Sequence, residues 1–167
     1  MLTILSANIN VFVDGILVAN RIGADALAAI NLSLPLYLAL CVIGSFMASG
    51  TAINAAQEIG GNNSEESNRY YSDCVIGSFF ASGIITVTGL ACREVLVDFL
   101  CSNAAIRPYV EEYVVITLIG ALPKIMIYVP FWYLRLDGKN AAVTVMMSVM
   151  SVGNIILDVL FVYVWDM

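Results

Sequence analysis

Two pairs of polar residues, each an amide followed by a carboxylate, stand inside apolar runs of this sequence. Asn154 and Asp158 are four residues apart, and Asn10 and Asp14 have the same spacing. Residues i and i+4 share one face of a helix, so each pair would present both side chains to the same neighbour. An ionisable group inside a membrane is costly and usually faces a bundle interior or a wet cavity. Both aspartates are therefore candidate functional residues if their runs cross a membrane.

The apolar run around Asp158 is long enough to do so. From 141 to 164 it covers roughly 24 residues, which at ~1.5 Å each exceeds a ~30 Å hydrocarbon layer. The whole chain of 167 residues is 60% hydrophobic and 12% charged, against roughly 25% charged in an average soluble domain. We predict an all-α, multi-pass membrane protein of about five transmembrane helices, without a separate soluble domain.

The spans that must position these residues are expected over 2–22, 26–56, 73–92, 109–133 and 141–164. The polar segment 57–72 should form an aqueous loop, and the residues after Cys92 should form an amphipathic, interfacial segment. We expect Pro35 to bend or loosen the second span, and Pro123 and Pro130 to interrupt the fourth.

Small residues recur at spacing four in the second span, at Gly44, Ala48 and Ala52. Such a stripe lets another helix approach closely, within this chain or from a partner. Small residues are also common in membrane helices without any such role, and the sequence leaves both interpretations open.

The order of the spans predicts that the polar residues meet in one layer. Spans one and five should run in the same direction, which places Asp14 and Asp158 roughly 10–12 Å below the same face at ~1.5 Å per residue. Tyr113 falls at about that depth. Two desolvated carboxylates in one pocket cannot both ionise cheaply, so they would hold a proton or Na⁺, with Asn10, Asn154 and Tyr113 supplying neutral oxygens. The alternative is that these groups only form interhelical hydrogen bonds.

Lys124 lies in the same predicted span as Tyr113 but roughly 16 Å further along the helix at ~1.5 Å per residue. A direct pair with Asp14 or Asp158 is therefore not expected. The lysine could extend its ammonium toward the membrane interface, or it could line a substrate cavity and repel or position the substrate.

Several function classes are disfavoured by composition. Net charge is −6 and no basic stripe is present, which argues against nucleic-acid binding. Histidine is absent, and no metal-ligand or catalytic motif stands out, so we expect no enzyme, no cofactor and no metal beyond a coupling Na⁺ at Asp14 and Asp158. The cysteines form no C-x-x-C pair and are interpreted as small apolar core residues: Cys41, Cys74, Cys92 and Cys101.

The chain also resembles the amino-terminal portion of a multidrug and toxic compound extrusion (MATE) transporter. The similar segments keep their order over nearly the whole sequence: Val13–Val18, Ile22–Ala29, Leu34–Pro35, Val110–Ile116, Gly120–Pro123, Arg135–Gly138 and Gly153–Asp158. The resemblance implies twelve helices in two six-helix lobes, a central cavity for organic cations, and export driven by inward Na⁺ or H⁺ flow. This chain would form most of one lobe.

The resemblance implies residue roles and partners as well. Asp14, Asp158 and Asn154 match the cation site of the first lobe, and Tyr113 matches through its Glu-Tyr segment. The expected partners are a small organic cation, the lipid bilayer of the cell membrane, and a missing second lobe or another chain. Two alternatives stay open: a lipid-linked sugar flippase of the same superfamily, which the scarcity of cations in the spans disfavours, and a non-transporting membrane partner that packs through the small-residue stripe.

Overall fold

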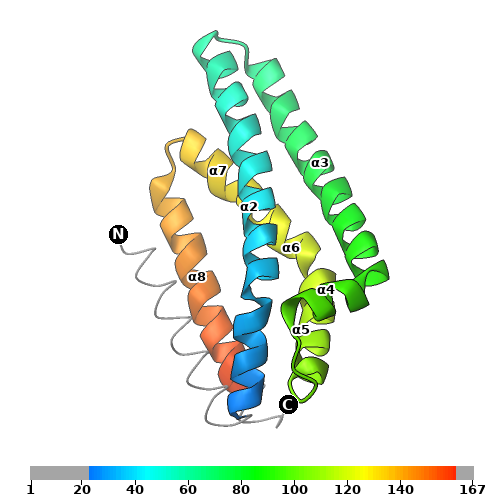
Figure 1. Ribbon diagram of the computed structural model, residues 1–167. Coiled ribbons are helices and arrows are strands. Elements are labelled where there is room, and N and C mark those ends of the chain that lie inside the picture. Colours follow the sequence, from blue (N-terminus) through cyan, green and yellow to red (C-terminus); the bar gives the residue numbers. More distant parts are fainter. Residues whose placement is uncertain (1–22, 161–167) are drawn as a thin grey trace.

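The computed structural model describes residues 23–160, apart from the side chains of Asp158 and Val159 (Figure 1). The predicted first span, with Asn10 and Asp14, lies outside the described residues. Within them the chain is helical and contains no strand, which confirms the all-α prediction. The helices are α2 (Ala24–Gly60), α3 (Ser64–Ala91), α4 (Arg93–Leu100), α5 (Arg107–Ile119), α6 (Ala121–Met126), α7 (Tyr128–Leu136) and α8 (Asn140–Val159).

Three of the described helices are long and apolar enough to cross a membrane: Ala24–Gly60, Ser64–Ala91 and Asn140–Leu157. Arg107–Ile119 and Ala121–Leu136 are bent by 55° relative to each other and would together make a fourth crossing. Helices therefore lie over the second to fifth predicted spans, with different bounds. The segment after Cys92 is the short helix α4, which is not among the candidate spans.

The loop predicted over 57–72 is wrong in extent, because only Gly61–Asn63 leave the helical conformation there. Asn62 adopts a left-handed φ of 60°. Asn63 then caps α3 by accepting a hydrogen bond from the backbone N–H of Glu66. The Asn, Ser and Glu residues that suggested a loop thus act as a helix start signal.

The consequence is a helical hairpin that is longer than a bilayer is thick. At ~1.5 Å per residue the 37 residues of α2 measure roughly 55 Å, against a hydrocarbon layer of ~30 Å. Figure 1 shows the α2–α3 hairpin projecting beyond the turn that joins α7 to α8. The helix α2 continues through Pro35 without ending.

The small-residue stripe is used inside the chain. A Cβ placed on Gly44 would lie 3.0 Å from the carbonyl oxygen of Ile125 and 2.7 Å from Cδ2 of Tyr128, so α2 meets the junction of α6 and α7 at van der Waals contact. Ala48 is buried in a cluster with Cys74 and Val129, and Ala52 is also buried. The alternative of a second chain docking on this stripe is therefore wrong.

We predict that Gly44→Ala destabilises the bundle by about 1–3 kcal/mol, because the added methyl group would meet backbone atoms of Ile125 that cannot swing away. Gly50 lies in the same helix, is exposed, and has nothing within 4 Å of an added Cβ. Gly50→Ala should be neutral or stabilising by about 1 kcal/mol, the ordinary helix-propensity gain. Thermal denaturation of the two purified variants in detergent compares them. Equal midpoints would show that the close approach at Gly44 does not limit stability.

Candidate functional site

The structure places the described candidate residues at one end of the bundle. Tyr113 lies in the second turn of α5, and Asn154 and Asp158 lie in the last two turns of α8. In Figure 1 the beginning of α5 and the end of α8 are both at the end of the bundle where α2 begins. For these three residues the course of the helices agrees with the predicted common layer. Its other members, Asn10 and Asp14, lie outside the described residues, and the cation site stays a prediction.

The described candidate side chains at this end differ in how far they are exposed. Tyr113 is half-buried and Asn154 is exposed, whereas the side chain of Asp158 is not described. Among the described helices, α5 packs on α2, α3 and α4, and α8 packs mainly on α7. The structure therefore brings these residues to one end of the bundle without making α5 and α8 close neighbours.

The orientation of Tyr113 is set by the buried face of α5. Val110, Val114 and Leu118 follow one another at spacing four and are almost fully buried. Two ion pairs also tie α5 to α4: Arg93 with Glu111 at 3.6 Å, and Arg107, the first residue of α5, with Asp98 at 2.7 Å. Such exposed pairs contribute only about 0–1 kcal/mol each. Apolar burial, rather than these charges, fixes the rotation of the helix that carries Tyr113.

The bend between α5 and α6 separates Tyr113 from Lys124. Pro123 has no N–H, so the carbonyl of Ile119 loses its usual helical partner. The neighbouring carbonyl of Leu118 accepts a hydrogen bond from the hydroxyl of Thr86 in α3 at 2.9 Å. Gly89, one turn further along α3, leaves room for the Leu118 side chain, whose Cδ2 lies 2.5 Å from the place a Cβ would take. Helix α3 therefore gives a hydrogen-bond donor to a carbonyl next to the break and leaves room for the Leu118 side chain.

Thr86→Val should destabilise the bundle by about 1–3 kcal/mol, because the isosteric side chain leaves the Leu118 carbonyl without its donor in an apolar setting. Thr88 provides the control, since its hydroxyl bonds to the Ile84 carbonyl within the same helix and is exposed. Thr88→Val should leave stability unchanged. Circular dichroism during thermal denaturation measures both variants; a Thr86→Val midpoint equal to that of the unmodified protein would refute the assigned role.

Lys124 contacts α2 instead of extending toward an end of the bundle. Its ammonium donates a hydrogen bond to the hydroxyl of Tyr37 and lies 3.6 Å from the centre of the Tyr37 ring. Tyr37 is the fourteenth residue of α2, roughly 20 Å from the start of that helix at ~1.5 Å per residue. An aromatic face and a hydroxyl together stabilise a cation that is partly removed from water. Both interpretations of Lys124, extension toward the membrane interface and lining of a substrate cavity, stay predictions.

Tyr37 is a residue that sequence analysis missed. It lies 87 positions from Lys124, and its neighbours along α2 are apolar, so no spacing rule connects the two. The cysteines were predicted only in part: Cys74 and Cys101 are buried, Cys41 is half-buried, and Cys92 is exposed. In the described part of the chain, no three His, Cys, Asp or Glu side chains gather in a way that could hold a metal ion.

With this fold the chain belongs to the class of multi-pass helical membrane proteins. The sequence profile of the MatE family matches residues 1–160, and the chain belongs to that family. It is similar in structure to a MOP superfamily transporter from Pyrococcus furiosus, with a TM-score of 0.91, 24% identity, and coverage of 98% of this chain and 36% of that one. A multidrug resistance MATE family transporter in an outward-facing conformation gives the same TM-score, identity and coverage.

A curated relative extends the comparison to sequence. The chain is 24% identical over 144 residues to a protein of Shewanella oneidensis named FAD transporter. The aligned residues cover 86% of this chain and 32% of that protein. All three similar proteins are named as transporters. The chain spans about a third of their length, which fits the predicted amino-terminal portion of a MATE transporter.

Proposed function

We propose that this chain forms the first-lobe part of a cation-coupled antiporter that exports organic cations across the cell membrane, with Na⁺ or H⁺ as the coupling ion. The observation that carries the proposal is the placement of Tyr113, Asn154 and Asp158 at one end of a MatE-family bundle. In this proposal Asp14, Asn10 and the three residues above form the coupling site.

The coupling would operate through the charge of the aspartates. A proton or Na⁺ neutralises the carboxylates, which are costly to hold unpaired at membrane depth. A ligand shifts a conformational equilibrium only by its differential affinity for the two states. The coupling ion must therefore bind one conformation more tightly than the other, and the organic cation must prefer the opposite one.

A second lobe completes the proposed pathway. The chain covers about a third of its structural relatives, and a single lobe cannot alternately close a pathway on two sides. Either further sequence or another chain would supply the facing surface. The apolar side chains exposed on α8, among them Val145, Val149 and Val152, provide a surface for such contact or for lipid.

In the protein at its natural length, Asp158→Asn should abolish cation-coupled export, because an amide keeps the shape of the side chain but cannot exchange a proton or neutralise Na⁺. Asp73→Asn is the matched control, since Asp73 is an exposed carboxylate of α3. Efflux of a fluorescent organic cation from cells, measured with and without a Na⁺ gradient and at two external pH values, compares the variants. Unchanged efflux and ion dependence in Asp158→Asn would refute the coupling role.

A second candidate substrate class is an anionic nucleotide, which the ammonium of Lys124 favours. The charge lies about midway along the bundle and is held by Tyr37 without a carboxylate partner among the described residues. The relative from Shewanella oneidensis is named FAD transporter, and FAD carries negative phosphates. In the expected central substrate cavity, Lys124 would then bind the substrate instead of repelling it.

Replacing Lys124 distinguishes the two substrate classes. If the substrate is anionic, Lys124→Met should lower FAD export at least about tenfold, the effect of losing one charged hydrogen bond of roughly 1.4 kcal/mol, and Lys124→Arg should restore most of it. Lys139→Met, in the exposed turn before α8, is the control. Flavin fluorescence in the medium of producing cells is the measurement. FAD export that does not change in Lys124→Met excludes this lysine as the anion-binding group.

A further inference from the structure

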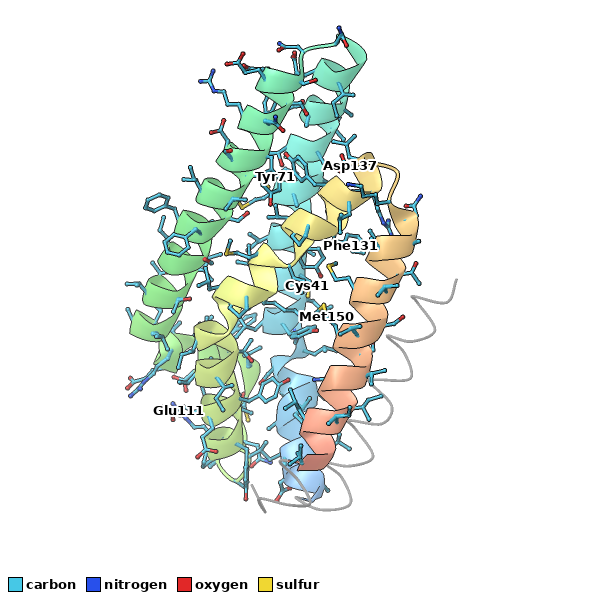
Figure 2. The ribbon with its side chains drawn as sticks, turned by 180° about the vertical axis from the view of Figure 1, so that it is seen from behind. Cys41, Tyr71, Glu111, Phe131, Asp137 and Met150 are labelled. Carbon is cyan, nitrogen blue, oxygen red and sulfur yellow. The ribbon has the colours of Figure 1, made fainter. Side chains whose placement is uncertain are left out.

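A cavity of about 560 Å³ lies between the α2–α3 hairpin and α7, at the opposite end of the bundle from Tyr113 and Asn154. This volume is in the range of small-molecule sites, roughly 300–1,000 Å³. Figure 2 shows Tyr71 of α3 and Asp137, just after α7, at the same height in this region. Its lining combines rings, a carboxylate and aliphatic side chains, among them Tyr71, Tyr133, Leu134, Leu136 and Asp137.

Two tyrosine rings form one wall of the cavity. Tyr71 and Tyr133 meet edge to face, with ring centres 5.0 Å apart and planes at 79°. Tyr71 is 44% exposed, so part of its ring is available to a ligand. The negative face of an aromatic ring attracts an organic cation within about 6 Å. The aliphatic side chains of Leu134 and Leu136 add apolar surface for the rest of such a molecule.

The charges around the cavity favour a cation over an anion. Among the residues that the structure describes, Asp137 is the only charged one that lines the cavity, and no lysine or arginine of that part of the chain does. The nearest basic residue of α7, Arg135, lies instead over the ring of Phe131, 4.2 Å from the ring centre. The carboxyl ends of α2 and α7 both lie here and carry partial negative charge, and Glu65 and Glu66 offset the positive amino end of α3.

The ion pair that Asp137 forms with Lys139 does not prevent Asp137 from binding a ligand cation. Its carboxylate lies 3.3 Å from the ammonium of Lys139, but the two side chains are 52% and 62% exposed. An exposed pair of this kind contributes about 0–1 kcal/mol. A ligand cation that also contacts the tyrosine rings can therefore replace Lys139 at low cost.

We propose that this cavity binds an amphipathic organic cation, with Asp137 opposite its charge and the rings of Tyr71 and Tyr133 against its apolar surface. The site is separate from the end of the bundle that carries Tyr113 and Asn154. In an exporter this cavity would collect substrate, at the end of the bundle that carries the α2–α3 turn, before transfer to the central pathway. That collecting role rests on the proposed export function, whereas the binding itself does not.

The test uses tetraphenylphosphonium as the probe and the purified protein at its natural length. Equilibrium dialysis should show a binding site that Tyr71→Leu and Asp137→Asn each weaken about tenfold, a loss of roughly 1.4 kcal/mol. Tyr109→Leu is the matched control, because Tyr109 is 45% exposed but lies in the first turn of α5 at the other end of the bundle. It should leave binding unchanged. Monodisperse elution and an unchanged melting temperature check that each variant is folded.

Three outcomes would overturn the proposal: affinity that is unchanged in Tyr71→Leu, an equal loss in Tyr109→Leu, or equally tight binding of the anion anilinonaphthalene sulfonate that Tyr71→Leu also weakens. The Asp158→Asn variant separates this proposal from the export function. It should lose export and keep the tyrosine-dependent binding. If the unmodified protein shows Tyr71-dependent binding but no ion-coupled export, the cavity is supported and the antiporter function is refuted.

Discussion

The interruption of the bent crossing at Gly120 and Pro123 is the constraint on which the described bundle depends. In a bilayer each backbone N–H and C=O needs a partner inside the protein, which continuous helices supply and a proline removes. The chain bends by 55° there, and α3 contributes the hydroxyl of Thr86 to the carbonyl of Leu118. The junction with α7 then fits against α2 only because Gly44 has no side chain. Helices α3 and α2 therefore both contact the chain on either side of this break.

Lys124 is also compensated locally. The ammonium of Lys124 is held by the hydroxyl and ring of Tyr37. The charged residues that form ion pairs lie near the helix ends, where water is available and each pair adds little to stability. The candidate coupling residues at one end and the tyrosine-lined cavity at the other are therefore separated by a middle section in which Lys124 is the notable charge.

The family and the class of function follow from different kinds of observation. Membership of the MatE family rests on a match over residues 1–160. The choice of coupling ion and substrate depends on a few side chains, and these are the features that differ most easily within one fold. Lys124 and Asp137 carry opposite charges in different parts of the bundle, and the two proposals therefore give them different ligands. This is why both substrate classes are tested through single residues.

The sequence by itself determined the membrane class, the all-helical fold and the break near Pro123, because hydropathy, helical period and proline chemistry are local properties. The alternating direction of successive spans also predicted one common end for Tyr113, Asn154 and Asp158, which the course of α5 and α8 matches, while Asn10 and Asp14 lie outside the described residues. The helical start at Ser64 was missed because polar capping residues resemble a loop when read alone. Only the tertiary structure decided that Tyr37 holds Lys124, that Gly44 faces Ile125, and that Tyr71 and Asp137 line one cavity. These residues are far apart in the chain, and no local pattern encodes which helix faces will meet.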